Sequence, residues 1–209
     1  MTCHASVFEE SDGLHLVLRP QVCQMNQRGL KLLCSLRENP LLFWIGPARG
    51  VLETVKKLGW RPDLIHCYGW AAALAPFYIK QAYSDEPSFR DCKVVMEVSP
   101  KEFEKDLGVE NAKFVEYKDA HYADIQDICG NAYGHSELEK IGVKFADGVI
   151  IENKDVDPSV IEYAKSLGRP VLDPVEGDSF NEAYTRAQQM CQSSGYCLCQ
   201  RITSDMAVW

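Results

Sequence analysis

Apolar residues in the central part of the chain alternate between short continuous runs and stretches with helical spacing. The continuous runs are typical of strands buried on both faces of a sheet, and they fall at 63–67, 93–98, 148–151 and 170–173. The helical spacing falls between and around these runs, at 48–58, 70–83, 122–129, 135–145 and 158–167. This alternation predicts βαβ units, and therefore a Rossmann-like α/β fold with a mostly parallel sheet and helices on both faces.

Several of the predicted helices have recognisable ends. Gly59 and Gly168 follow two of them, where a glycine stops a helix by adopting a left-handed conformation. Asp157 is a typical N-cap residue, and Pro158 suits the first helical position because its missing N–H would have no helical partner. These signals predict a helix that begins directly after Asp157.

The two ends of the chain lack this regularity. Residues 1–47 contain apolar clusters without a sustained period, and 186–209 form a short tail; together these segments hold most of the nine cysteines. We expect an irregular amino-terminal segment at 1–47, a Rossmann-like domain at 48–185 and an irregular tail at 186–209. Translation in a shifted reading frame would give such ends, and they would then make few contacts with the domain.

Charge and composition exclude several classes of protein. A net charge of −8 and an isoelectric point near 5.2 argue against nucleic acid as a partner, because no basic surplus can displace phosphate counterions. No apolar run approaches the roughly 20 residues of a membrane helix, and the first residues do not resemble a signal peptide, so a soluble cytoplasmic protein is expected. The odd number of cysteines and the lack of a Cys-x-x-Cys pair predict neither a disulfide framework nor a metal site; Cys197 and Cys199 are the nearest approach to one.

Polar residues lie at the end of the first predicted strand and directly after it, where ligands of parallel sheets bind. His66, Tyr68, Gly69 and Trp70 offer an imidazole, a phenol, a close backbone approach and an indole at a helix start, which together suit a sugar or a phosphate. Structural roles explain the same residues: a hydrogen bond for His66, a turn for Gly69 and core packing for Trp70. We retain both interpretations, with substrate binding as the functional hypothesis.

A second candidate group follows the 148–151 strand. Glu152 and Asn153 would lie at the same edge of the sheet, and we add them to the predicted substrate-binding residues. No catalytic residue can be assigned.

Two histidines lie among acidic residues near the 122–129 helix. A metal or acid–base site is conceivable there, but solvated helix faces are the favoured interpretation because the i, i+4 histidine pair of a zinc helix is absent. The residues concerned are His121, His135, Asp119, Asp124, Asp127, Glu137 and Glu139. Fingerprints for dinucleotide binding, NTP hydrolysis and α/β-hydrolase chemistry are also missing.

Two segments resemble the amino-terminal catalytic domain of bacterial glycogen synthases and plant starch synthases, glycosyltransferase family five. Residues 49–53 read Arg-Gly-Val-Leu-Glu, and 59–76 read Gly-Trp-Arg-Pro-Asp-Leu-Ile-His-Cys-Tyr-Gly-Trp-Ala-Ala-Ala-Leu-Ala-Pro. The family has Trp-x-Pro-Asp-Ile-Ile-His, then His-x-His-Asp-Trp-His and Thr-Ala-Leu-Ala-Pro. Residues 85–91 and the Phe-Ala-Asp-Gly-Val-Ile of 145–150 extend the likeness, which covers about 48–175. The resemblance implies one half of a two-domain GT-B glucosyltransferase.

The sequence departs from the family at positions that matter for catalysis. Tyr68 stands where the family has a histidine, Gly69 where it has aspartate, and Ala71 where it has the histidine of its sugar site. The family's Ile-His-Asn is Met-Glu-Val at 96–98, and its Thr-Val-Ser is Ile-Glu-Asn at 151–153. Its Lys-x-Gly-Gly loop is missing, and 209 residues cannot contain its nucleotide-binding carboxyl-terminal domain.

Two function hypotheses remain. The first is a domain of a glycogen or starch synthase-like glucosyltransferase, which moves glucose from a nucleotide sugar to an α-1,4-glucan, with this chain inactive on its own. The second is a non-catalytic module of the same ancestry that binds a glucan or a partner chain. No cofactor is expected; a nucleotide-sugar donor such as ADP-glucose is implied by the resemblance alone, and an oligomer or partner would have to complete the cleft. A flavodoxin-like protein of unrelated function is the third, least supported interpretation.

Overall fold

The computed structural model describes residues 2–10, 13–21, 40–104, 115–130 and 133–174, and side chains from residue 48 onward within those ranges. Six strands form one sheet in the order of the sequence: β1 (Thr2–Glu10), β2 (Gly13–Gln21), β3 (Leu64–Tyr68), β4 (Lys93–Val98), β5 (Gly148–Ile151) and β6 (Val171–Leu172). β1 pairs with β2 antiparallel, and all other neighbours are parallel. The described part is therefore an α/β fold built on a mostly parallel sheet, which confirms the predicted fold class.

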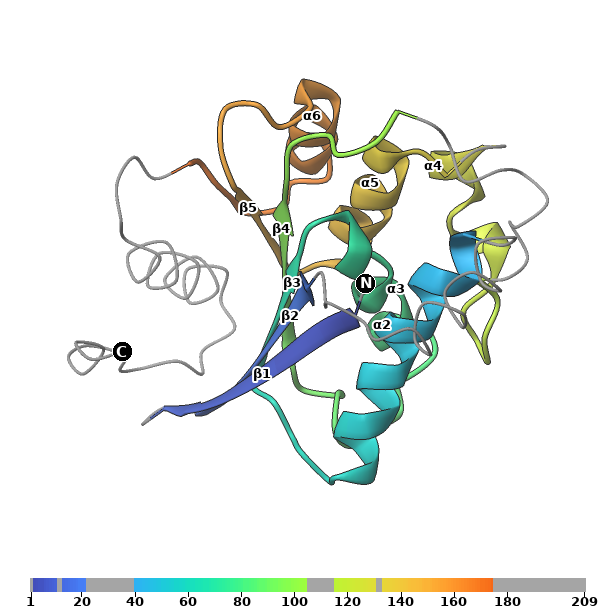
Figure 1. Ribbon diagram of the computed structural model, residues 1–209, viewed down its shortest axis with the longest axis vertical. Coiled ribbons are helices and arrows are strands. Elements are labelled where there is room, and N and C mark those ends of the chain that lie inside the picture. Colours follow the sequence, from blue (N-terminus) through green and yellow to red (C-terminus); the bar gives the residue numbers. More distant parts are fainter. Residues whose placement is uncertain (1, 11–12, 22–39, 105–114, 131–132, 175–209) are drawn as a thin grey trace, which may run out of the picture.

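The connecting helices are α2 (Pro40–Lys57), α3 (Leu74–Lys80), α4 (Gln126–Cys129), α5 (His135–Phe145) and α6 (Pro158–Ser166). They lie on one side of the sheet (Figure 1). The expectation of helices on both faces is therefore not met in the described residues. Strands that follow one another in sequence order, joined by right-handed crossovers, place every crossover helix on the same face.

None of the described helices combines the length and the apolar character that a membrane span requires.

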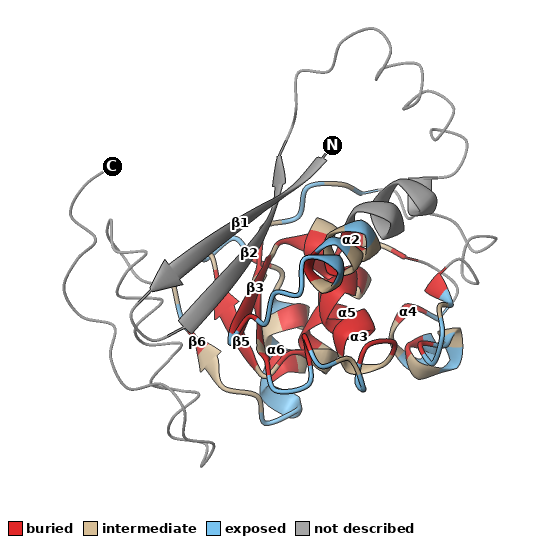
Figure 2. Cartoon of the chain, turned by 90° about the horizontal axis from the view of Figure 1, so that it is seen from below, coloured by how far each residue is buried: buried red, intermediate tan, exposed pale blue. Residues whose placement is uncertain are grey.

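Strand side chains divide between two apolar clusters on opposite faces of the sheet. Ile65, Val94, Met96 and Val149 belong to the large cluster that includes the helices. Figure 2 shows the buried residues concentrated between this face and the helices. The alternate strand positions form a small second cluster of Leu64, Val95, Ile150 and Leu172. This period of two is what a pleated sheet imposes, and it explains why these strands read as continuous apolar runs.

The predicted strands and most helix signals are confirmed. β3 to β6 lie within one residue of the predicted runs, and 135–145 is helical as expected. The predicted helix at 70–83 is divided into a 3₁₀ turn, Trp70–Ala72, and α3, and the one at 122–129 into a 3₁₀ turn, Tyr122–Asp124, and α4. Asp157 caps α6, where its carboxylate accepts from Ser159 N at 2.9 Å. Gly59 and Gly168 have φ of 67° and 65°, the left-handed stops that the sequence predicted.

The amino-terminal residues differ from the irregular segment expected at 1–47. β1 and β2 are regular nine-residue strands, and β2 pairs in register with β3, Leu16 opposite Ile65. α2 also begins at Pro40, eight residues before the predicted helix start. Backbone pairing with a neighbouring strand stabilises such segments without a strong local period. Residues 22–39 and the predicted tail at 186–209 lie outside the described residues, and the proposed domain division stays a prediction.

Candidate functional site at the carboxyl edge of the sheet

The predicted site residues lie together at one edge of the sheet. β3, β4 and β5 run parallel, so their carboxyl ends meet at the same edge. Tyr68 is paired in register with Glu97, and Glu97 with Ile150. The backbone N–H of Glu152 donates to Val98 O at 3.1 Å, which ties the loop after β5 to the end of β4. The topology therefore brings residues 66–70, 97–99 and 152–153 into one cluster.

His66 is buried within this edge. Its side chain is 1% exposed, and its Nε2 lies 2.7 Å from Glu97 Oε2, whose side chain is 12% exposed. A buried imidazole beside a carboxylate is oriented by it, since the carboxylate selects which ring nitrogen holds the proton. His66 therefore lies inside the edge, where it contacts Glu97, and presents little surface to a ligand.

Tyr68 is the more accessible of the two β3 side chains. Its hydroxyl donates to Glu152 Oε1 at 2.7 Å. Burial raises the pKa of the Tyr68 phenol well above its ordinary value, with further increases from the bond to Glu152 and from the charges of Glu152, Glu97 and Glu102. Tyr68 is therefore a neutral hydrogen-bonding group in an environment of negative potential.

Gly69 occupies a turn that only glycine adopts easily. Its φ of 66° and ψ of 176° lie in a region unfavourable to residues with a Cβ. A Cβ at this position would lie 3.3 Å from Ser99 Oγ, and the Gly69 N–H donates to Glu97 O at 2.8 Å. The structural interpretation of Gly69 is thus supported, and Ser99 lies directly against the turn.

Trp70 is 6% exposed and begins the 3₁₀ turn that follows β3. Its indole N–H donates to Glu102 Oε2 at 2.8 Å, and its ring packs edge-on against Phe103 with centroids 4.7 Å apart. The ring of His135 lies 6.3 Å away. Trp70 thus anchors the segment after β4 to the turn after β3.

Asn153 forms a turn of its own loop. Its Oδ1 accepts from Asp155 N at 2.8 Å, an Asx turn that shapes the chain after β5. Asn153 and Glu152 are both half-buried. These two side chains, with Tyr68, form the part of the predicted site that a ligand could reach.

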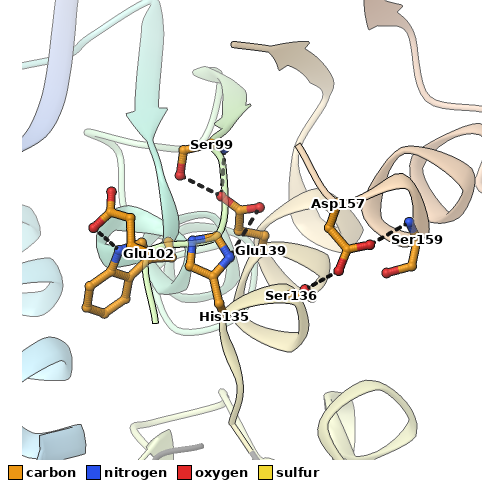
Figure 3. A network of polar contacts seen from close by, with 8 residues as sticks. Ser99, Glu102, His135, Ser136, Glu139, Asp157 and Ser159 are labelled. Carbon is orange, nitrogen blue, oxygen red and sulfur yellow. Dashed lines mark hydrogen bonds and ion pairs between the residues drawn. The ribbon is translucent and has the colours of Figure 1, made fainter. Parts of the chain in front are cut away.

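A buried acidic group that the sequence analysis assigned to a solvated helix face lies beneath this edge. Glu139 of α5 is 0% exposed, and its Oε1 accepts from Ser99 N at 2.8 Å and from Ser99 Oγ at 3.0 Å (Figure 3). His135, one helical turn earlier, is 2% exposed. The prediction of solvated faces is therefore wrong for both residues, because α5 turns this stripe toward β4 and Trp70. His121 is exposed, in agreement with that prediction.

The electrostatics around Glu139 favour neutral forms. Burial raises the pKa of Glu139 to about 8; the bonds from Ser99 oppose the increase, and the charges of Glu102 and Glu152 add to it. Burial also lowers the pKa of His135. His135 Nδ1 lies 3.9 Å from Glu139 Oε2, within ion-pair range but beyond a hydrogen bond. Because desolvation disfavours both charges, we take the pair as a neutral acid beside a neutral imidazole.

Sequence reasoning missed three residues of this site, Glu97, Ser99 and Glu102, and placed Glu139 on a solvated helix face. Glu97 lies near the end of β4, and Ser99 and Glu102 follow that strand, where only 96–98 had been compared with the family pattern. Glu139 had a signal, since it lies four residues after His135 on the inward stripe of a predicted helix. A carboxylate on such a stripe indicates a buried acid.

The arrangement accepts hydrogen bonds more readily than it binds negative charge. Glu97, Glu102 and Glu152 surround Tyr68 and Trp70. Glu97 and Glu152 are half-buried, and Glu102 is exposed. Within the described ranges, no group of three or more His, Cys, Asp or Glu side chains is placed to hold a metal ion. Cys197 and Cys199 lie outside those ranges. The edge as built suits polar, uncharged ligands.

Comparison with known proteins identifies the family. The model of the starch synthase catalytic domain matches residues 42–157, more than half of the chain. A glycogen synthase of Chlorobium phaeovibrioides is 30% identical over 165 residues, which cover 64% of this chain and 33% of that protein. A glycogen synthase of Pelodictyon phaeoclathratiforme is 51% identical over 49 residues, 23% of this chain and 10% of its own.

A solved structure agrees with the fold. The catalytic domain of starch synthase IV from Arabidopsis thaliana, bound to ADP and acarbose, superposes with a TM-score of 0.50 at 13% sequence identity. The superposition covers 66% of this chain and 30% of that one. The chain thus spans about a third of the length of the glycogen synthase of Chlorobium phaeovibrioides. On the evidence of the family model and these relatives, the chain belongs to the starch synthase catalytic domain family.

Proposed function

We propose that this chain is a glucosyltransferase-family domain that binds an uncharged α-glucan at the carboxyl edge of its sheet and does not transfer glucose by itself. The observation behind the proposal is the concentration of carboxylates there. Glu97, Glu102 and Glu152 accept hydrogen bonds or lie in contact with Tyr68, Trp70 and His66. Glucan hydroxyls donate hydrogen bonds well to carboxylates, whereas the diphosphate of a nucleotide sugar would meet like charge.

The negative potential affects groups across the edge. Burial is the main cause of the raised pKa of both Tyr68 and Glu139, which lie on different elements, and the charges of Glu102 and Glu152 add to both increases. A diphosphate placed among them would lose the cationic stabilisation that transfer from a nucleotide sugar needs. This supports glucan binding over donor binding.

The expected lack of transfer rests on residue chemistry. Ala71 has only a methyl group, which can neither donate a hydrogen bond nor accept a proton, where the family has its sugar-site histidine. Closure of a cleft between two domains is what excludes water from such reactions, and the described residues form one wall of such a cleft.

A second candidate is a half-site completed by a partner chain. The solved relative binds ADP and acarbose in a chain of which this one covers 30%. A partner that supplied basic groups could offset the carboxylates and admit a nucleotide sugar. ADP-glucose binding that appears only when a second chain is added would favour this candidate.

Titration calorimetry with maltoheptaose and with ADP-glucose tests the proposal. We expect heat from maltoheptaose, little from ADP-glucose, and no radiolabelled glucose transferred into glycogen above a heat-killed control. Glu152→Gln should weaken maltoheptaose binding because Tyr68 loses a charged acceptor. Glu162→Gln, the same change at an exposed position of α6, is the matched control. Tighter binding of ADP-glucose than of maltoheptaose, or transfer above the control, would contradict the proposal.

A further inference from the structure

The end of β4 is held by a buried acid, Glu139, that lies beneath the accessible edge. Glu139 Oε1 accepts both the backbone N–H and the hydroxyl of Ser99, the first residue after β4. Its Oε2 has no hydrogen-bond partner among the described residues. One carboxylate oxygen thus fixes Ser99 while the other remains available for a proton.

Ser99 passes this constraint on to the turn after β3. Its Oγ lies 3.3 Å from the position that a Cβ would take on Gly69, so the Ser99 hydroxyl closes against the Gly69 backbone. Gly69 is also bonded through its N–H to Glu97 O. Glu139, Ser99 and Gly69 therefore form a stack from the interior of α5 to the turn that precedes Trp70.

His135 completes the environment of the second oxygen. Its Nδ1 lies 3.9 Å from Glu139 Oε2, and its ring packs edge-on against Phe103 with centroids 5.3 Å apart. As a neutral imidazole it offers a proton-accepting nitrogen beside a neutral acid. Several charged groups face this pair from the surrounding elements: Lys101 and Glu102 after β4, Glu137 on α5, Glu152 after β5 and Asp157 before α6.

We propose that Glu139, buried beside His135, is a positioning residue that fixes Ser99 against Gly69 beneath the proposed glucan site. Loss of the buried proton places a negative charge under the edge, which strengthens the attraction of the two Ser99 donors and draws them toward the carboxylate. The Gly69 turn and the Tyr68 side chain before it then shift with Ser99. The proposal rests on the proposed function only for its effect on glucan affinity; the structural coupling stands without it.

Backbone amide NMR across pH 6 to 9 tests the coupling on the full chain. In the natural sequence, the Ser99 and Gly69 amide signals should move with a common midpoint near pH 8, the value to which burial raises the pKa of the Glu139 carboxyl. Glu139→Gln keeps an acceptor for Ser99 and cannot titrate, so both movements should disappear. Glu137→Gln, the same change on a partly exposed position of α5, should leave them unchanged.

Glucan affinity provides the second measurement. Maltoheptaose binding should weaken about fivefold from pH 7 to pH 9 in the natural chain, which corresponds to the loss of roughly one hydrogen bond, and stay constant in Glu139→Gln. If no maltoheptaose binds at any pH, the proposed function fails while the amide signals still decide the coupling. If the Ser99 and Gly69 amide signals move with the same midpoint in Glu139→Gln as in the natural chain, the coupling itself is overturned. Should that variant not fold, Ser99→Ala replaces it, and an unchanged Gly69 midpoint there would overturn the proposal.

Discussion

The carboxyl groups of Asp157, which is bonded to α5, and of Glu139, which lies on α5, have pKa values shifted in opposite directions. Both are drawn in Figure 3. Asp157 accepts from Ser136 Oγ at 2.6 Å and from Ser159 N at 2.9 Å, at the amino end of α6. Glu139 accepts two bonds of similar length from Ser99. The pKa of Asp157 is lowered, chiefly by its bond from Ser136, whereas burial raises that of Glu139. Two carboxyl groups that accept the same number of hydrogen bonds thus have pKa values shifted in opposite directions, because they differ in desolvation.

The difference distinguishes Asp157, whose charge stabilises the fold, from Glu139, whose burial is unfavourable for its charge. A half-buried N-cap carboxylate keeps contact with water and with the positive end of a helix, so its charge is favourable. A fully buried carboxyl favours its protonated form, because hydrogen bonds alone do not offset the loss of hydration. Cores tolerate such a group where it also performs a task, and here it lies under the candidate site.

The largest expected effect is a pH-dependent gain of stability in Glu139→Gln. Between pH 4.5 and 8 the unfolded chain has lost the Glu139 proton that the folded chain keeps, so stability falls as the pH rises. Glutamine has no such proton. We expect the unfolding free energy of the variant, relative to the natural chain, to rise by about 3 kcal/mol from pH 5.5 to 7.5.

Urea unfolding of both chains at several pH values measures this difference. Taking the difference cancels the other titrating groups that the two chains share. His135 acts on stability in the opposite direction to Glu139. Its lowered pKa gives stability that is present at high pH and lost as the pH falls. A difference that stays constant with pH would show that Glu139 is ionised in the folded chain.

The next effect concerns Asp157. Asp157→Ala removes the N-cap of α6 and the acceptor of Ser136, and we expect a loss of about 1–2 kcal/mol at pH 7. Because the folded pKa is lowered, the contribution of the charge is present above the ordinary value and is lost as the pH falls through the folded one. The loss should therefore shrink below about pH 4.

Chemical unfolding at pH 7 and pH 3 gives this comparison, with Asp155→Ala as the matched control on an exposed loop position. A loss of equal size at both pH values would assign the effect to packing rather than to charge.

The sequence predicted the central sheet well and the site only in part. β3 to β6 could be found because both faces of each strand are apolar, and Asp157 with Pro158 marked the start of α6. β1 and β2 could not, since their place depends on pairing with β3 rather than on a local period. His66 and Trp70 were found by position but are held by Glu97 and Glu102, partners that only the folded chain brings near.

The smallest expected effect tests how Ser99 links Glu139 to Gly69. Ser99→Ala removes the hydroxyl bond to Glu139 and leaves the backbone bond in place, so a loss of about 1 kcal/mol is expected in urea unfolding at pH 6. The hydroxyl bond favours the charged form of Glu139, because the Ser99 interactions lower its pKa. Removing it should raise the Glu139 midpoint, which the carboxyl carbon signal in NMR reports directly. A midpoint that falls instead would mean that water enters the space left by the hydroxyl and hydrates the carboxylate. In that case the acid in the natural chain keeps its proton because its surroundings are dry.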